Sequence, residues 1–201
     1  MSQFQLVLAS ASKGRQMVLD KCAIAYQKKP ADVDETALEG ESAIDLVQRL
    51  SILKAQTIAQ SLNGSFLVIG SDQVGLVDQT ILTKPLNHEK ATEYLRLCRN
   101  REIYYFTGLC LYDVAAQSYE YVLDTSVVQM ANYSDADIER YLQEQKPYFC
   151  AGALQVEGVG ISFIKNIQAK DPNTLIGLPL IDLQHLLEKK QLHLLDFVAQ
   201  K

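Results

Sequence analysis

The sequence predicts an α/β protein in which helices flank a sheet, and three patterns carry this prediction. A continuous apolar run at residues 66–69 is typical of a strand that is covered on both faces. Apolar residues recur at helical spacing through residues 42–62. Residues 102–111 and 119–129 are rich in Thr and Tyr, and they predict two strands that pair antiparallel around a turn.

Composition limits both the size of the fold and the class of partner. A chain of 201 residues that is 48% hydrophobic can bury the core of one domain or of two closely joined halves. Its net charge of -5 argues against broad binding to nucleic acid, although a small anionic ligand would respond to local charge. No apolar run approaches the length of about 20 residues that a membrane span needs.

The cysteines and the N-terminal sequence predict a reduced, cytoplasmic protein. The four cysteines show no paired short spacing, and the N-terminal residues lack the order of regions found in a signal peptide.

The first strand is predicted at residues 5–9, followed by a helix that Ser10 or Ser12 caps. The loop between them carries Lys13 and Arg15. Free backbone N–H groups, the helix dipole and these cations would suit an oxyanion. The alternative is an ordinary capped helix with exposed basic residues.

Residues 31–42 are too acidic and too polar for a core, and they predict an ordered loop. Asp32, Asp34 and Glu35 offer hard oxygen ligands to Mg²⁺ or Mn²⁺, provided that other carboxylates converge on the same point. The alternative is a solvated acidic loop.

The next helix is predicted from Ser42 to the Asn-Gly pair at residues 63–64. Lys54 lies near its apolar face. Its ammonium either reaches a cleft or extends along the surface into solvent.

Gly70 is predicted to end the strand that begins at residue 66, which leaves Asp72 directly after it. Open α/β sheets bind ligands at such strand ends, so Asp72 is the first site candidate. A reversal at residues 78–79 would form a hairpin that returns Lys84 towards Asp72. In the alternative interpretation Asp72 caps a turn and Lys84 is a solvated charge.

The rest of the chain continues the alternation of elements. Asn87 predicts a helix that runs to about residue 98, and Ser134 with Asp137 predicts a capping box. Glycines on both sides of Glu157 let the backbone bend there. A turn at residues 171–173 precedes a final helix.

Six motifs in this order resemble the Maf family of nucleoside triphosphate pyrophosphatases, and the resemblance covers almost the whole chain. They are LVLASASKGR at residues 6–15, VDET at 33–36, RLSILKAQ at 49–56, IGSDQV at 69–74, TKP at 83–85 and DPNTLIGLPL at 171–180.

The resemblance implies an elongated α/β fold with a mixed twisted sheet and a central cleft. It implies one domain over residues 1–201 with two lobes around that cleft. It also implies a divalent metal cofactor (Mg, Mn or Co), a small-molecule nucleotide substrate and a cytoplasmic location. Homodimers occur among relatives.

The resemblance also assigns roles to individual residues. Asp72 would be the general base, and Glu35 with Asp72 would hold the metal. The residues completing the triphosphate site would be Ser10, Arg15, Glu35, Lys54 and Lys84. Those at positions that set base choice would be Gly14, Gln73 and Glu157. Hydrolysis between the α and β phosphates needs such cations to absorb phosphate charge and such a base to activate water.

The pairing of IGSDQV with VEGVGI at residues 156–161 resembles the subgroup that acts on 7-methyl-GTP. Three positions depart from its pattern. Gly14 stands where that subgroup has Trp, Gln16 replaces an Arg, and Thr83 replaces a Gly. A dTTP or UTP pyrophosphatase, or a nucleotide-binding regulator of cell division without turnover, remain the alternatives.

Overall fold

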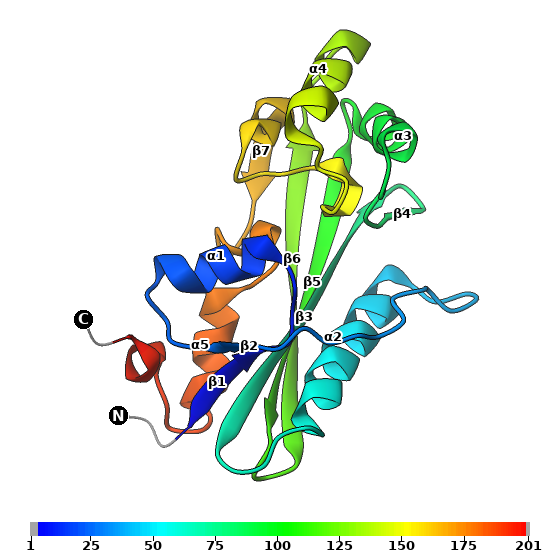
Figure 1. The fold of residues 1–201 in the computed structure, drawn as a ribbon. Coiled ribbons are helices and arrows are strands. Elements are labelled where there is room, and N and C mark those ends of the chain that lie inside the picture. The colour runs from blue at the N-terminus through cyan, green and yellow to red at the C-terminus, as the bar shows by residue number, and fades with distance from the viewer. Residues whose placement is uncertain (1–3, 200–201) are drawn as a thin grey trace. The chain divides into compact units, whose positions relative to one another are not determined.

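A seven-stranded sheet organises the computed structural model, which describes residues 4–199 (Figure 1). The strands are β1 (Gln5–Leu8), β2 (Gln27–Lys28), β3 (Phe66–Val77), β4 (Thr80–Leu82), β5 (Glu102–Asp113), β6 (Ser118–Met130) and β7 (Ile164–Gln168). The α-helices are α1 (Lys13–Lys21), α2 (Ala43–Ala59), α3 (His88–Cys98), α4 (Asp135–Gln145) and α5 (Leu180–Glu188). Short 3₁₀ helices are η1 (Ala151–Ala153), η2 (Val159–Phe163), η3 (Thr174–Ile176) and η4 (Leu194–Phe197).

The sheet is mixed, as the family resemblance implies. Its strand order is β2-β1-β3-β5-β6-β7, with β4 paired to β3 outside this path. Strand β1 pairs parallel with both β2 and β3. The pairs β3–β4 and β6–β7 are antiparallel. The prediction of an α/β fold with a mixed sheet flanked by helices is therefore confirmed.

The chain divides into two compact units. The first unit holds the described residues up to Asp72, Thr107–Asp124, and the described residues from Asp171 onward. The second unit holds Gln73–Phe106 and Thr125–Lys170. Strands β3, β5 and β6 contribute residues to both. The two-lobed domain with a central cleft stays a prediction.

In the first unit, helices cover both faces of the sheet. Successive strand side chains point to opposite faces, and both faces carry apolar residues that need to be buried. Helices α1 and α5 lie on one side of the strands and α2 on the other (Figure 1). The α1/α5 side buries Leu6, Leu8, Leu67, Ile69, Leu109 and Leu111 with Val18, Leu19, Leu183, Leu186 and Leu187. The α2 side buries Val7, Ala9, Val68 and Cys110 with Ala55, Ile58 and Ala59. Apolar residues on both faces explain the unbroken run in β3.

Gly70 does not end β3, so that prediction is wrong. The strand continues through it to Val77. A Cβ at Gly70 would lie 2.8 Å from Cβ of Ala55 and closer still to the carbonyl oxygen of Ser51. Glycine is needed there because the backbone of α2 packs directly on β3.

The helix starts follow the sequence predictions. Ser12, Ser42 and Asn87 each accept a hydrogen bond from a backbone N–H in the first turn, and Ser134 forms a capping box with Asp137. Helix α2 ends at Ala59, four residues before the predicted Asn63. The early end lets Leu62 turn back into the apolar cluster beneath the helix.

An aromatic cluster forms the centre of the second unit. The ring of Phe163 lies 4.4 Å from that of Tyr133 and 5.0 Å from that of Tyr141, between centroids. The Tyr133 hydroxyl donates to the carbonyl of Leu95, and the Tyr141 hydroxyl donates to that of Ala153. These bonds satisfy the buried hydroxyls and tie α3 and η1 to the same core.

The described helices are all too short or too polar to span a bilayer. All four cysteines are free thiols. Burial raises the pKa of Cys98 and of Cys110 to about 12. Both thiols therefore stay protonated and act as small apolar core side chains.

We expect Gly70→Ala to destabilise the protein by about 1–3 kcal/mol, because the added methyl group would push α2 away from β3. Urea unfolding measures the change. The matched control is Gly158→Ala, whose Cβ would meet no atom closer than 3.5 Å. Equal stability of Gly70→Ala and wild type would contradict the close packing.

Candidate active site

Asp72 lies within β3 and not after it. Because side chains alternate along the strand, Asp72 shares the face of Val68 and Gly70, which is the face that α2 covers. It is buried, with 6% of its surface exposed. A carboxylate in this position needs a partner, and α2 supplies one.

Lys54 is that partner. Its helix presents Ser51 and Ala55 to Gly70, and Lys54 lies on the same side of α2. The Lys54 Nζ atom lies 2.6 Å from Oδ1 of Asp72 and 2.6 Å from Oε1 of Glu35. Only 4% of Lys54 is exposed, so the alternative of a surface lysine is wrong.

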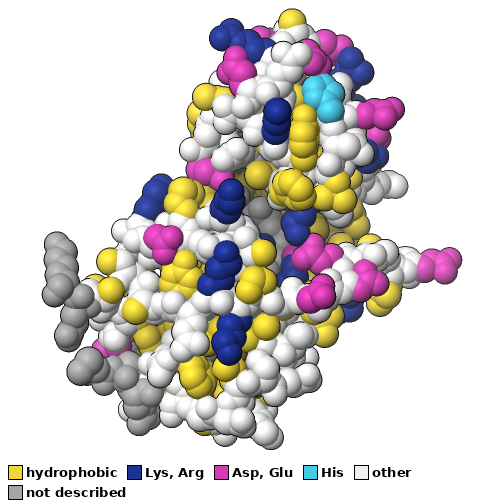
Figure 2. All heavy atoms as spheres, in the orientation of Figure 1, with side chains coloured by type: hydrophobic (Ala, Val, Ile, Leu, Met, Phe, Trp, Pro, Cys, Tyr) yellow, Lys and Arg dark blue, Asp and Glu magenta, His cyan; other side chains and the backbone are white. Residues whose placement is uncertain are grey.

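Glu35 reaches Lys54 from the acidic loop, residues 31–42, which precedes α2. Figure 2 shows acidic side chains gathered on this segment, and the Glu35 side chain itself is 41% exposed. Asp34 has another task, since its Oδ1 accepts the backbone N–H of Thr36. Hydrogen bonds from Thr36 lower the pKa of Asp34. Of the predicted acidic candidates in this loop, the structure brings Glu35 to Lys54.

Arg15 is buried at the start of α1. Its Nε donates to the carbonyl of Gly177 at 2.8 Å, and its Nη1 donates to the Ser10 hydroxyl at 3.2 Å. Burial lowers the pKa of Arg15, while the negative charges of Asp72 and Glu35 act in the opposite direction. The guanidinium remains charged, and those two carboxylates are near enough to act on it.

Sequence analysis assigned no site residue to the segment around Gly177, which contacts Arg15. The Ser71 hydroxyl also donates to the Gly177 carbonyl, at 2.8 Å. Gly177 has φ of +103°, and a Cβ there would lie 3.1 Å from Nε of Arg15. Asp171 is fully buried and accepts the N–H groups of Asn173 and Ile181, which fixes the loop before α5. The motif at residues 171–180 was the only signal for this support.

The charges of the cluster balance. Within the first unit, Lys54 contacts the carboxylates of Asp72 and Glu35, and the charges of the same two carboxylates act on Arg15. No group of three or more His, Cys, Asp or Glu side chains among residues 4–199 is arranged to hold a metal by itself. Two carboxylates that contact one nitrogen do suit Mg²⁺, which takes one or two protein carboxylates and completes its shell with waters and substrate phosphates.

Three further predicted residues, Gln73, Lys84 and Glu157, belong to the second unit. Gln73 follows Asp72 in β3 and is half-buried. Lys84 is exposed after β4, where the Thr83 carbonyl accepts the N–H of Gly152. Glu157 is exposed in a turn closed by the Gly158 N–H, which donates to the carbonyl of Gln155. The roles of these three residues stay predictions.

Gly14 packs more tightly than the sequence suggests. A Cβ at this position would lie 3.0 Å from Cγ2 of Ile176 and 3.2 Å from its carbonyl oxygen. An aromatic side chain at residue 14 would therefore require Ile176 to move. Its role in base choice also stays a prediction.

Comparisons with known proteins identify relatives over nearly the full chain. A family model described as Maf-like protein matches residues 5–190. A Vibrio parahaemolyticus protein named 7-methyl-GTP pyrophosphatase is 42% identical over 97% of this chain and 100% of its own. A Nitrosococcus oceani protein of the same name is 42% identical over 92% of each chain. The solved Staphylococcus aureus Ham1 protein superposes with a TM-score of 0.49 and 18% identity, covering 92% of this chain and 99% of that one.

We expect Lys54→Met to destabilise the protein by about 3–5 kcal/mol, because it leaves the buried Asp72 carboxylate without its ammonium partner. A double-mutant cycle with Asp72→Asn, measured by urea unfolding, should give a coupling energy above about 1 kcal/mol. The same cycle with Glu35→Gln is the control, since a more exposed pair should couple by less. If the two coupling energies were equal, burial would not govern this cluster.

Proposed function

Because the chain belongs to the Maf family, we propose that it is a nucleoside triphosphate pyrophosphatase that hydrolyses 7-methyl-GTP to the monophosphate and pyrophosphate. The coarse assignment, a Maf-family nucleotide pyrophosphatase, is supported by relatives of that name at about 40% identity over nearly the whole chain. The methylated guanine is the finer part of the proposal.

The observation that carries the proposal is the contact of Lys54 with both Asp72 and Glu35, next to the buried Arg15. A protein that only binds nucleotides has no need of a base. Here a buried carboxylate lies on a strand among cations, and this arrangement suits the activation of water beside a phosphate. An enzyme is therefore favoured over a regulator that binds without turnover.

Each residue has a task in the proposed reaction. Asp72 accepts a proton from the attacking water, and Lys54 orients its carboxylate through Oδ1. Arg15, Lys54 and Lys84 bind phosphate oxygens by charge-assisted hydrogen bonds. They also take up the charge that develops on the leaving pyrophosphate. Ser10 and the Gly177 carbonyl hold the guanidinium of Arg15 in place.

A divalent cation fits this donor set, and Glu35 with Asp72 would hold it. When bound, it would withdraw charge from the phosphate oxygens and lower the pKa of a coordinated water. The charges of the proposed site agree with such a need. The two carboxylates offset Arg15 and Lys54, which leaves Lys84 as the remaining positive charge for a triphosphate that carries several negative charges.

Base choice is proposed to rest on Glu157 and Gln73. Methylation at N7 makes guanine cationic, so the Glu157 carboxylate would attract it and accept hydrogen bonds from its N–H edge. Pyrimidines lack that positive charge. Gly14 offers no aromatic surface for stacking, so affinity should be lower than in relatives with Trp there.

We further propose a cytoplasmic protein that acts on a small nucleotide, with no role for nucleic acid or membrane, and that can form a homodimer. Four free thiols support a reducing compartment.

We expect wild-type protein to release pyrophosphate from 7-methyl-GTP faster than from GTP, dTTP or UTP when Mg²⁺, Mn²⁺ or Co²⁺ is supplied. Asp72→Asn should lower kcat by about 10²–10⁴-fold, because the near-isosteric amide cannot accept the proton. Circular dichroism of the mutant checks that the fold is retained. Binding of the nucleotides with no pyrophosphate release would favour a regulator, and preference for dTTP or UTP would overturn the substrate.

We expect Glu157→Gln to reduce the preference for 7-methyl-GTP over GTP by about tenfold or more, because charge-assisted hydrogen bonds are roughly twice as strong as neutral ones. The ratio of kcat/KM values for the two nucleotides measures this. Glu144→Gln, an exposed change on α4, is the matched control. An unchanged ratio in Glu157→Gln would remove Glu157 from base recognition.

A further inference from the structure

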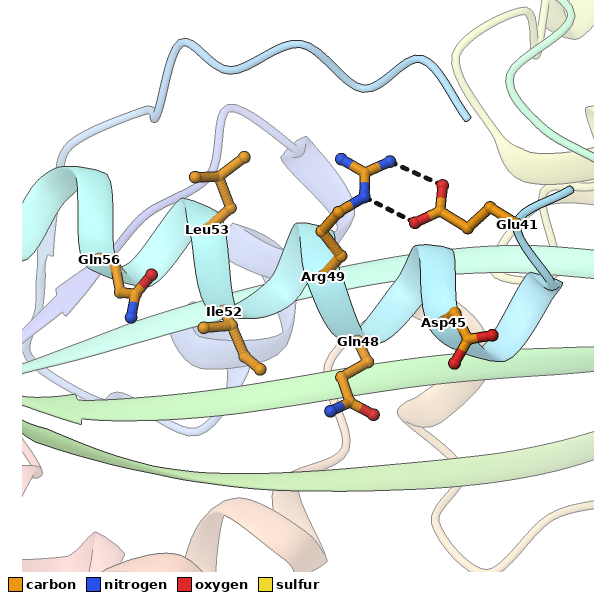
Figure 3. A pocket seen from close by; sticks show the side chains of 7 residues that line it. All are labelled: Glu41, Asp45, Gln48, Arg49, Ile52, Leu53 and Gln56. Carbon is orange, nitrogen blue, oxygen red and sulfur yellow. Dashed lines mark hydrogen bonds and ion pairs between the residues drawn. The ribbon is translucent and has the colours of Figure 1, made fainter. Parts of the chain in front are cut away.

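We propose that Arg49 is a positioning residue for Glu35, which it holds through a clamp on the acidic loop. This inference rests on the proposed function, because it gives a task to a residue that touches neither substrate nor metal in that scheme. Arg49 lines a groove along α2 (Figure 3). The other residues that line this groove are Glu41, Asp45, Gln48, Ile52, Leu53 and Gln56.

Arg49 makes three hydrogen bonds to this loop. Its Nε donates to Oε1 of Glu41 at 2.6 Å, and its Nη2 donates to Oε2 at 2.8 Å (Figure 3). The same Nη2 donates to the carbonyl oxygen of Thr36 at 3.0 Å. Thr36 directly follows Glu35, so the guanidinium holds the backbone next to the carboxylate that contacts Lys54.

Glu41 extends the clamp back along the loop. Its Oε2 also accepts the backbone N–H of Leu38 at 2.9 Å. The hydrogen bond from Arg49 lowers the pKa of Glu41 to about 2, so this carboxylate is charged at any pH used for activity measurements. Thr36, Leu38 and Glu41 are thus fixed by one guanidinium and one carboxylate.

The loop depends on these side-chain contacts because much of it lacks the backbone hydrogen bonds of a helix or strand. Residues 31–38 form neither helix nor strand. Asp72 is held by the sheet, whereas Glu35 is 41% exposed and depends on its loop for orientation. The Arg49 side chain is 29% exposed and the Glu41 side chain is 7% exposed, so this pair is partly buried. Arg49→Lys leaves a cation beside Glu41, and it should therefore affect catalysis more than folding.

Lysine cannot replace the clamp. A guanidinium presents a planar fork that matches both carboxylate oxygens, while an ammonium is a point charge. Arg49→Lys keeps a positive charge beside Glu41. It loses the hydrogen bond to the second carboxylate oxygen of Glu41 and the hydrogen bond to the Thr36 carbonyl. It therefore separates geometry from charge.

We expect Arg49→Lys to lower kcat with 7-methyl-GTP by about 10–100-fold, the usual cost of losing a residue that orients a ligating side chain. KM should change less than kcat, since Arg49 lies outside the proposed phosphate contacts. The divalent-metal concentration for half-maximal activity should rise. Hydrogen exchange of the loop amides in residues 35–41 should become faster, while the midpoint of urea unfolding stays close to that of wild type.

Two further variants sharpen the test. Glu41→Gln retains a side-chain acceptor but removes the charge, so it should act in the same direction with a smaller loss. The matched control is Arg96→Lys in α3, where Nε and Nη2 both donate to Asp135 on an exposed surface. It makes the same change at another arginine–carboxylate contact, in which both nitrogens donate to Oδ2 of Asp135, and it should leave kcat and loop exchange unchanged.

The outcomes separate this inference from the proposed function. If wild-type protein released no pyrophosphate from any nucleotide, the proposed function would be wrong. Faster exchange of the loop amides in Arg49→Lys would still support the clamp. If wild type turned over but Arg49→Lys matched it in kcat and loop exchange, the clamp would be overturned. A uniform rise in exchange across the first unit would reduce Arg49 to a residue of general stability.

Discussion

The structure depends on one buried ammonium. Lys54 has almost no access to water, so its charge is tolerated only because two carboxylates contact it. Those contacts require α2 to lie close against the sheet. Gly70 in β3 permits this, and so does Gly108 in β5, where a Cβ would lie 2.7 Å from Val47. Two glycines therefore set the separation at which Lys54 and Asp72 meet.

The members of the site are supported in different ways. Asp72 belongs to a strand whose backbone is held by its neighbours in the sheet, so its position follows from the fold. Arg15 is held by the carbonyl of Gly177 and by Ser10. Glu35 belongs to a loop and depends on side-chain contacts outside the site. Precision at the proposed metal position is therefore set by the least regular part of the first unit.

Local interactions explain what sequence analysis predicted well. Each of these features involves residues within a few positions of one another: the strand patterns, the helix caps and the reversal at Asp78. Their energies depend little on the rest of the fold. Ser42 and the Ser134–Asp137 box mark helix starts in the structure. Asp78 adopts φ of 52° between β3 and β4.

The sequence by itself determined the α/β class, the order of its elements and, through motif order, the family. Tertiary structure decided which candidates meet. Gly70 was predicted as a break because a lone glycine interrupts an apolar run, and only the approach of α2 reveals its packing role. The sequence left two positions open for the Lys54 ammonium, the surface or a cleft. The structure decides between them, because Lys54 contacts the buried Asp72. Arg15 meets the Gly177 carbonyl across 162 positions of sequence, a separation at which no local pattern reports contact.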